Sequence, residues 1–218
     1  MPAFPTAKYH RTRRSLMNAA MVLMTDKGVD GVSMSDIAAR AGVSRGTVYN
    51  YFDSVHELMG ALAAEMEAEL AAEIEAVNEQ APDPALRVVF GMKTYLARAS
   101  RDHDWGRFMA RFALSYASLT SGISEYGLAD IQAGVDAGRF HVPEDQRLAT
   151  MAVLAGSTLV GMAMIVNGVA PFRFDEQVVT QALTVLGVDL AEAKRLARTP
   201  LPVIDRAPSA QLPGPVNR

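Results

Sequence analysis

A short run of side chains near the N-terminus, SRGTVYN at residues 44–50, holds the groups that proteins use to contact DNA. At about 100° per residue, a helix starting at Arg45 places Gly46 and Asn50 on the side opposite Val48 and Phe52. An asparagine amide can bind adenine through two hydrogen bonds, an arginine can do the same with guanine, and hydroxyl groups hold phosphates. The run therefore predicts a helix with one buried side and an outward side suited to nucleic acid.

The segments around this run predict the elements that position it. Ser33 begins a helix with Asp36 three residues later, a capping-box arrangement with Asp in place of the usual Glu, and Gly42 ends that helix. Ser44 then caps the next helix, after a connection short enough for a helix-turn-helix. An ordinary helical hairpin with a polar exterior has the same periodicity, so the pattern alone leaves both alternatives open.

The distribution of charge agrees with a DNA-contacting module. Residues 1–52 hold seven basic and three acidic residues, a net charge of +4, whereas the remainder holds 14 basic and 21 acidic residues, a net charge of −7. The overall charge of −3 would by itself argue against a polyanionic partner. A small basic segment joined to a larger acidic one indicates that only the first meets nucleic acid.

The longer string GVSMSDIAARAGVSRGTVYNYFDSVHELMGAL decides against the ordinary hairpin. Over about residues 11–62 the chain resembles the DNA-binding domain of the tetracycline-repressor (TetR) family of bacterial transcriptional regulators. The residues that carry the resemblance are Ser33, Asp36, Ile37, Ala38, Ala41, Gly42, Val43, Ser44, Gly46, Thr47, Tyr49, Tyr51, Phe52, Ser54 and Leu58.

The resemblance also implies roles for single residues. Those expected to contact bases are Arg45, Gly46 and Asn50, and those expected to contact the phosphate backbone are Ser33, Ser35, Thr47, Tyr49 and, half in the core, Tyr51. One position departs from the family, because Val55 stands where a lysine is usual. A missing cation there predicts weaker or less salt-dependent binding to DNA.

The rest of the chain has helical periodicity throughout, so we expect an all-α fold with two domains. Helices are predicted at 11–27, 34–41, 45–52, 54–79, 84–100, 104–119, 123–137, 144–167, 175–186 and 190–198. The predicted organisation is a flexible basic arm at 1–10, the helix-turn-helix domain at 11–53, an effector-binding and dimerisation domain at 54–198 and a Pro-rich mobile tail at 199–218. The helix from residue 54 to 79 links the two domains.

One predicted helix carries an aromatic stripe, which we expect to line an effector pocket because the family binds small effectors in this domain. The stripe comprises Trp105, Phe108, Met109, Phe112 and Tyr116. Apolar and aromatic side chains are typical of ligand pockets, but a plain core face has the same composition. The effector would then be a small apolar or aromatic compound.

Residues 148–172 contain no charged residue, which is long enough to span a membrane. A membrane-associated helical protein is therefore one alternative, although the stretch is rich in Ala and Gly and no second segment resembles it. We favour a helix that packs on its own domain on one side and on a second copy of the chain on the other, as the family does. The residues expected at the dimer interface are Met151, Ala155, Gly156, Leu159, Ala163, Ala182 and Leu186.

The sequence contains few of the features that indicate an enzyme. There is no cysteine, the four histidines are far apart, and no phosphate-binding loop or nucleophile elbow is present. We therefore expect no enzyme, no metal and no cofactor, and, without a secretion signal at the N-terminus, a cytoplasmic homodimer that binds double-stranded operator DNA and no membrane. A helical small-molecule-binding protein that has lost operator binding remains the second alternative.

Overall fold

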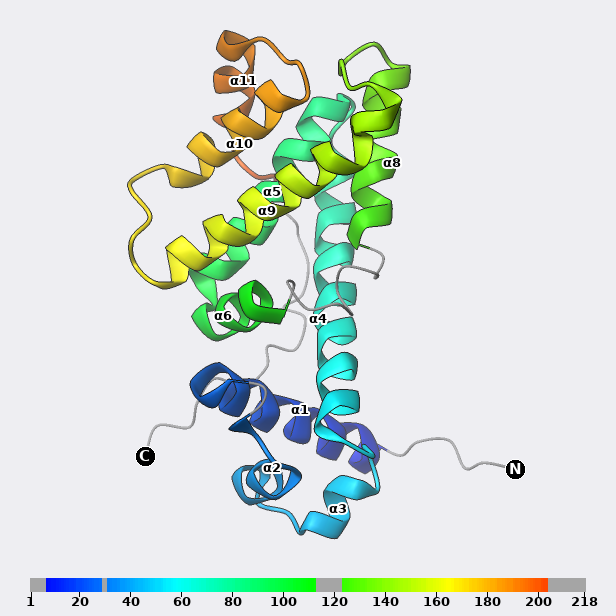
Figure 1. Ribbon diagram of the computed structural model, residues 1–218, viewed down its shortest axis with the longest axis vertical. Helices are drawn as coiled ribbons and strands as arrows, with labels where there is room; N and C mark the ends of the chain where they lie inside the picture. Colours follow the sequence, from blue (N-terminus) through cyan, green and yellow to red (C-terminus); the bar gives the residue numbers. More distant parts are fainter. Residues whose placement is uncertain (1–6, 29–30, 113–122, 204–218) are drawn as a thin grey trace, which may run out of the picture. The chain divides into compact units, whose positions relative to one another are not determined.

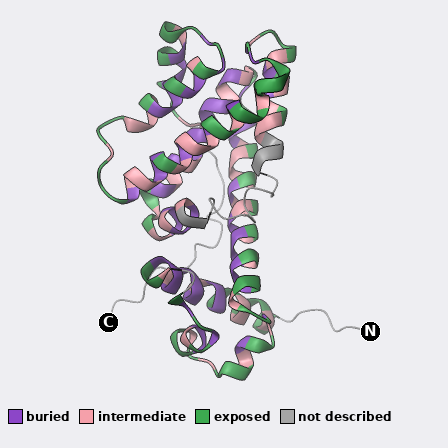
Figure 2. Cartoon of the chain, viewed as in Figure 1, coloured by how far each residue is buried: buried purple, intermediate pink, exposed green. Residues whose placement is uncertain are grey.

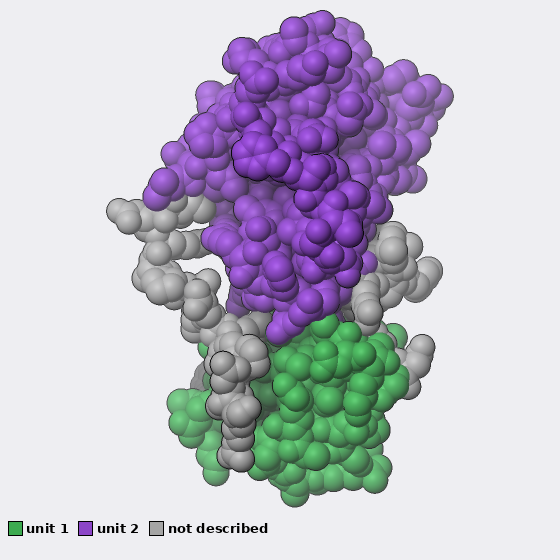
Figure 3. All heavy atoms as spheres, turned by 90° about the vertical axis from the view of Figure 1, so that its left-hand side faces the viewer, with its two compact units in different colours: residues 1–66, 205–218 green, residues 67–204 purple. Residues whose placement is uncertain are grey.

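The computed structural model describes residues 7–28, 31–112 and 123–203, and all regular structure in these ranges is helical (Figure 1). The chain divides into two compact units. One comprises residues 1–66 with 205–218, and the other comprises residues 67–204 (Figure 3). The first unit thus extends 13 residues beyond the predicted boundary at residue 53, because the first turns of the long helix α4 (Val55–Asn78) bury Leu58 and Leu62 in it.

In the first unit, α1 (Ala7–Lys27) packs against α2 (Met34–Ala41), and α2 packs against α3 (Arg45–Tyr49) (Figure 1). Their apolar positions recur at helical spacing and therefore face one core. The fully buried members of that core include Leu16, Ala20, Ile37, Val48 and Leu58.

Local capping sets where α2 and α3 begin and end. The Ser33 hydroxyl accepts a hydrogen bond from the Asp36 amide, and the Asp36 carboxylate accepts one from the Ser33 amide, as the predicted capping box requires. Gly42 ends α2 with a φ of 68°, a left-handed conformation that favours glycine. Ser44 then accepts from the Thr47 amide and caps α3. The two helices are therefore joined by a connection of three residues, Gly42, Val43 and Ser44.

The second unit contains α5 (Pro84–Arg101), α6 (His103–Phe112), α8 (Ile123–Asp136), α9 (Arg147–Val166), α10 (Phe174–Val185) and α11 (Leu190–Ala197). A short 3₁₀ turn, Glu144–Gln146, precedes α9. In Figure 1, α9 runs across α5, and it packs on α5, α6 and α10.

Glycines allow this close packing. A Cβ atom at Gly161 of α9 would lie 2.9 Å from Leu96 of α5, and one at Gly106 of α6 would lie 2.7 Å from Val166 of α9. Contacts this short leave no room for a larger residue, so these helices approach each other at glycine positions.

The predicted helices are present, with differences at their ends. The first begins at Ala7, inside the segment predicted to be a flexible arm, because Tyr9 packs against Tyr51. The predicted helix 104–119 is described to Phe112, and its remainder lies outside the described residues. The proposed mobile tail is described only to residue 203.

Candidate DNA-binding site

The structure places the side chains of α3 as the periodicity predicts. Val48 and Phe52 are 0% and 3% exposed, whereas Arg45, Gly46 and Asn50 are exposed. The segment after Tyr49 continues for one more turn, since the Phe52 amide donates to the Val48 carbonyl at 3.1 Å. One side of this segment is thus fixed in the core while the opposite side is open to a partner.

The N-terminal end of α3 combines free space with an ordered hydroxyl pair. The Ser44 and Thr47 hydroxyl oxygens lie 2.8 Å apart, so the Ser44 hydroxyl that caps α3 also holds the Thr47 side chain through a second hydrogen bond. A Cβ atom added at Gly46 would meet only the Ser44 hydroxyl, at 3.9 Å. A nucleic-acid backbone could therefore come close to the peptide at this point.

Arg45 and Tyr49 contact each other along the exposed side of α3. The Arg45 guanidinium donates to the Tyr49 hydroxyl at 3.2 Å and lies 5.4 Å from the centre of its ring. This hydrogen bond raises the pKa of Arg45 further, so the group is a permanent cation. A predicted base-contacting residue and a predicted phosphate-contacting residue are therefore held together before any DNA is bound.

The start of α2 presents a second set of predicted backbone contacts. Ser35 is exposed, and the Ser33 hydroxyl donates to Asp36 at 2.5 Å. Hydrogen bonds from Ser33 lower the pKa of the Asp36 carboxyl, and Lys27, at 3.4 Å, lowers it by a smaller amount. The Ser33 hydroxyl is thus shared with the cap, whereas Ser35 projects from the first turn.

Tyr51 has a partner that sequence reasoning missed. Its ring stacks on that of Tyr9, with centroids 4.6 Å apart and planes 28° from parallel. One turn further along α1, the Arg13 guanidinium lies 5.5 Å from the centre of the Phe52 ring. In the sequence, the four-residue spacing of Tyr9 and Arg13 indicates that the two side chains lie on one side of a helix, but it does not show which residues they contact.

Comparison with known proteins identifies the chain. Residues 16–62 match the family model described as bacterial regulatory proteins, tetR family. Residues 83–199, more than half of the chain, match the model described as the tetracyclin repressor-like, C-terminal domain. The chain belongs to the TetR family.

Individual relatives show how the TetR likeness is distributed. The HTH-type transcriptional repressor LfrR of Mycolicibacterium smegmatis is 39% identical over 62 residues, which cover 28% of this chain and 32% of LfrR. An uncharacterized HTH-type regulator of Mycobacterium tuberculosis is 27% identical over 167 residues, 71% of this chain and 82% of that protein. The first curated relatives have the highest identity to this chain, but the match covers only about a third of their length.

Solved structures extend the TetR likeness over most of the chain. The crystal structure of RolR in complex with resorcinol superposes with a TM-score of 0.69 at 26% identity and covers 90% of this chain and 98% of RolR. The ketosteroid transcriptional regulator KstR2 of Mycobacterium tuberculosis has a TM-score of 0.58 at 18% identity over 80% of this chain and 93% of KstR2. The second of these shows the fold alone.

In the second TetR unit, the described part of the aromatic stripe is buried. Trp105, Phe108 and Met109 are 1%, 3% and 1% exposed, and the Arg98 guanidinium lies 5.6 Å from the centre of the Trp105 ring. The Phe112 side chain and Tyr116 lie outside the described residues. The predicted pocket along this stripe therefore stays a prediction.

Polar groups also occur in the interior of this unit. Burial, together with the charge of Glu67 on α4, raises the pKa of Tyr95 on α5 to about 12. The phenol is consequently neutral, and able to donate a hydrogen bond, at any physiological pH.

The residues predicted at the dimer interface fall into two groups. Met151, Ala155, Gly156, Leu159 and Ala163 of α9 are partly exposed. In contrast, Ala182 and Leu186 are 3% and 0% exposed and lie in the core of their own unit, so the structure does not place them at a free surface. They face inward because α10 packs its apolar side against α5 and α11.

Exposed apolar residues mark the outer side of α9 instead. Exposed positions recur along this helix in Figure 2, and the large ones on α9 and α10 are Leu148, Val153, Val160 and Val185. In the described part of the chain, the segment Glu144–Val166 is long and apolar enough to cross a membrane by length and composition, and 33% of its apolar window is buried. An interior helix of a monomer would be buried far more completely.

Proposed function

We propose that the protein is a transcriptional regulator that binds a specific operator through α3, which we call the recognition helix. The observation that supports this most strongly is the division of that helix into a fully buried side, at Val48, and an open side that presents Arg45, Gly46 and Asn50. Membership of the TetR family supports the same function. Since operator DNA is the partner, we place the protein in the cytoplasm.

The proposed operator is a pseudo-palindrome bound by a homodimer. In a symmetric dimer each recognition helix contacts one half-site, and the half-sites must lie about one helical turn of DNA, or a multiple of it, apart. The outer side of α9 is the proposed dimer contact, because Gly156 lies among Ala152, Val153 and Val160 on a side with no charged residue. A surface of this kind is unfavourable in water and suits a closely packed partner helix.

We further propose that a small apolar or aromatic effector releases the DNA. RolR, which shares the fold over most of its length, was crystallised with resorcinol, an aromatic diol. In the proposed mechanism, the effector binds among the helices of the second unit, shifts α4 and thereby changes the spacing of the two recognition helices. A ligand can do this only to the extent that it prefers the released conformation over the DNA-bound one.

Selection from a random-sequence DNA library tests operator binding. The protein is expected to recover duplexes with two related half-sites. Asn50→Ala is then expected to lower affinity for them by about 1–3 kcal/mol, the value of a good base contact, and to relax preference at one position in each half-site. Gln80→Ala removes an exposed amide from the other unit and serves as the control. Failure to recover any preferred sequence would refute operator recognition.

Light scattering tests the dimer. The wild-type protein is expected to be a dimer at micromolar concentration. Gly156→Arg is expected to be a monomer, because a Cβ atom at Gly156 would point into open space and the rest of the side chain would enter the interface. Gly60→Arg adds the same side chain at an exposed helical glycine outside α9. A monomeric wild-type protein would contradict both the dimer and the two-half-site operator.

Trp105 provides the test of effector binding, since it is the only tryptophan. A panel of small aromatic diols and related phenols is titrated while Trp105 fluorescence and operator affinity are measured. A compound that acts as the effector changes the fluorescence and weakens operator binding, and operator DNA weakens its binding by the same factor. A compound that changes the fluorescence and leaves operator affinity unchanged is excluded as the effector.

A further inference from the structure

The contact between α1 and the end of the recognition helix is made by residues of α1 that precede the segment matched by the family model. The match to the family's DNA-binding domain begins at residue 16, whereas α1 begins at Ala7 and its first turns contact the segment after α3. Tyr9 covers Tyr51, and Arg13, one turn later, covers Phe52. Two successive residues at the end of the recognition helix are thus contacted by two residues on one side of α1.

The segment they contact is held unequally at its two residues. The helix ends at Tyr49, and the Tyr51 and Phe52 amides both donate to the carbonyl of Val48, at 3.0 and 3.1 Å. Phe52 is anchored by burial at 3% exposure, but Tyr51 is only half-buried. A half-buried tyrosine retains several orientations unless its neighbours restrict it, and the stacked ring of Tyr9 is one such neighbour.

Arg13 fixes the position of α1 in this arrangement. Besides lying over Phe52, its guanidinium donates to the carboxylate of Glu65 on α4 at 3.0 Å, with both side chains about one third exposed. The part of α1 that carries Tyr9 is therefore tied both to the Tyr51–Phe52 segment and to α4, the helix that follows it.

The charge around this contact suits a polyanion. Lys8, Arg11 and Arg14 are exposed on the same turns of α1, and no acidic residue precedes Asp26 in the sequence. A DNA backbone could thus come close to Tyr51 without meeting a like charge from α1.

We propose that Tyr9 is a positioning residue for DNA recognition, which holds the Tyr51 side chain in the orientation that contacts a backbone phosphate. This inference rests on the proposed function, since it requires operator binding. It extends the DNA-binding unit to the first turns of α1, beyond the segment matched by the family. Tyr9 itself acts through Tyr51 and needs no contact with DNA.

Binding measurements use a duplex recovered by selection with the wild-type protein. Tyr9→Leu removes the flat ring and is expected to weaken binding about three- to tenfold, the range typical of one aromatic pair. Tyr9→Phe keeps the ring and is the matched control, expected to bind within about twofold of the wild type. Tyr51→Phe removes only the hydroxyl that contacts the phosphate.

A backbone scan separates positioning from a general loss of stability. Each phosphate of the duplex is replaced in turn by a neutral methylphosphonate, and the loss of affinity is expressed relative to the same variant on unmodified DNA. The phosphate at which the wild type is sensitive and Tyr51→Phe is not identifies the Tyr51 contact. Tyr9→Leu is expected to lose sensitivity at that phosphate alone, whereas a merely less stable domain would keep its sensitivity at every phosphate.

The outcomes distinguish this inference from the proposed function. Sensitivity retained by Tyr9→Leu at the Tyr51 phosphate, or equal losses in Tyr9→Phe and Tyr9→Leu, would overturn the positioning role while operator binding stands. A Tyr51→Phe protein with the wild-type phosphate profile would overturn it as well. Recovery of no preferred duplex by the wild type would instead refute operator binding, and this inference with it.

Discussion

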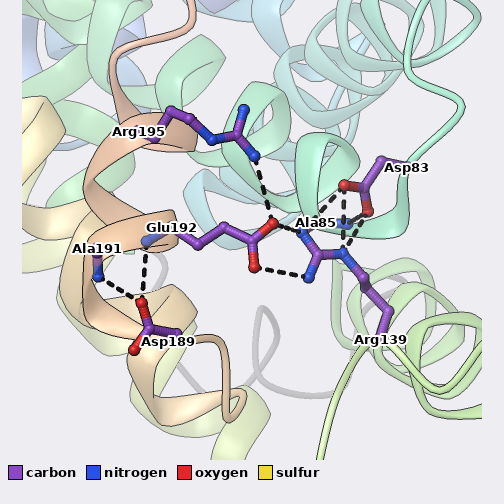
Figure 4. Close-up of polar contacts among 7 residues, drawn as sticks. All are labelled: Asp83, Ala85, Arg139, Asp189, Ala191, Glu192 and Arg195. Atoms are coloured by element: carbon purple, nitrogen blue, oxygen red, sulfur yellow. Dashed lines mark hydrogen bonds and ion pairs between the residues drawn. The ribbon is translucent and has the colours of Figure 1, made fainter.

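Replacing Arg139 by glutamine tests how the second unit is held together. Figure 4 shows this guanidinium between two carboxylates from separate elements. It donates to Asp83, the N-cap of α5, at 3.0 and 3.1 Å, and to Glu192 of α11 at 2.8 and 3.2 Å. Arg139 itself lies in the turn after α8, so one side chain joins three parts of the unit.

The expected cost follows from the exposure of the group. Hydrogen bonds between charged groups contribute about 1.5–3 kcal/mol when well buried, and exposed ion pairs contribute about 0–1 kcal/mol. The side chains of Arg139 and Asp83 are 24% and 30% exposed, between these limits. We therefore expect Arg139→Gln to lower the free energy of unfolding by about 1–2 kcal/mol at pH 7. The loss of stability is not expected to be larger, because water can solvate the carboxylates of Asp83 and Glu192 in the variant.

The same contacts predict a pH dependence. Burial would raise the pKa of Asp83, but the hydrogen bonds from Arg139 and the Ala85 amide prevail and lower it. The hydrogen bond from Arg139 also lowers the pKa of Glu192. A carboxyl with a lowered folded-state pKa stabilises the fold above its unfolded value of about 4 and loses that effect as the pH falls through its folded value. The difference between wild type and Arg139→Gln should therefore shrink below about pH 4.

Urea denaturation followed by circular dichroism measures both effects. The protein concentration is held fixed, because a dimer's stability depends on it. Arg195→Gln is the matched control: its side chain is 69% exposed and donates one bond to Glu192, at 3.3 Å, so it should change stability by less than about 0.5 kcal/mol. An Arg139→Gln protein as stable as the wild type at pH 7, or a difference equally large at pH 7 and below pH 4, would refute the reasoning.

Three further substitutions have defined outcomes. Val55→Lys should steepen the dependence of log affinity on log salt by about 0.9 by adding one phosphate contact, with Val55→Gln unchanged, as measured on the selected duplex. Gly134→Ala should destabilise the fold by about 1–3 kcal/mol in urea denaturation, because the new Cβ would lie 1.9 and 2.1 Å from ring carbons of buried Phe140. Lys93→Met should cost about 1–3 kcal/mol in the same assay, since this 8%-exposed lysine donates to carbonyls at the end of α11 at 2.9 and 2.8 Å.

The helices and their caps could be predicted because their determinants lie within a few residues of each other. Ser33 and Asp36 are three apart, and Asp83 precedes Pro84 directly. Both predicted caps are present, with Asp83 accepting from the Ala85 amide at 2.9 Å. The buried side of α3 could be predicted for the same reason, because helical periodicity places Val48 and Asn50 on opposite sides of one short segment.

Contacts between distant residues could not be predicted in this way. Tyr9 and Tyr51 are 42 positions apart, and nothing in either neighbourhood selects the other as partner. The predicted interface shows the same limit. Ala182 and Leu186 are apolar on an amphipathic helix, a pattern that is the same whether the helix covers its own core or a second copy. Only the packing of α10 shows that they face inward.

The small residues on the outer side of α9 favour a protein partner over a lipid bilayer. The polar residues Thr150 and Thr158 face the interior of the unit, where the Thr158 hydroxyl donates to the Leu154 carbonyl at 2.9 Å. The outward side has Ala152 and Gly156 at its centre, and a Cβ atom added at Gly156 would point into open space. Lipid chains gain little from such small residues, whereas another helix can approach closely over them and recover contact along its whole backbone. A second copy of the chain therefore suits this surface better than a bilayer. A dimer formed through this proposed contact would carry two recognition helices.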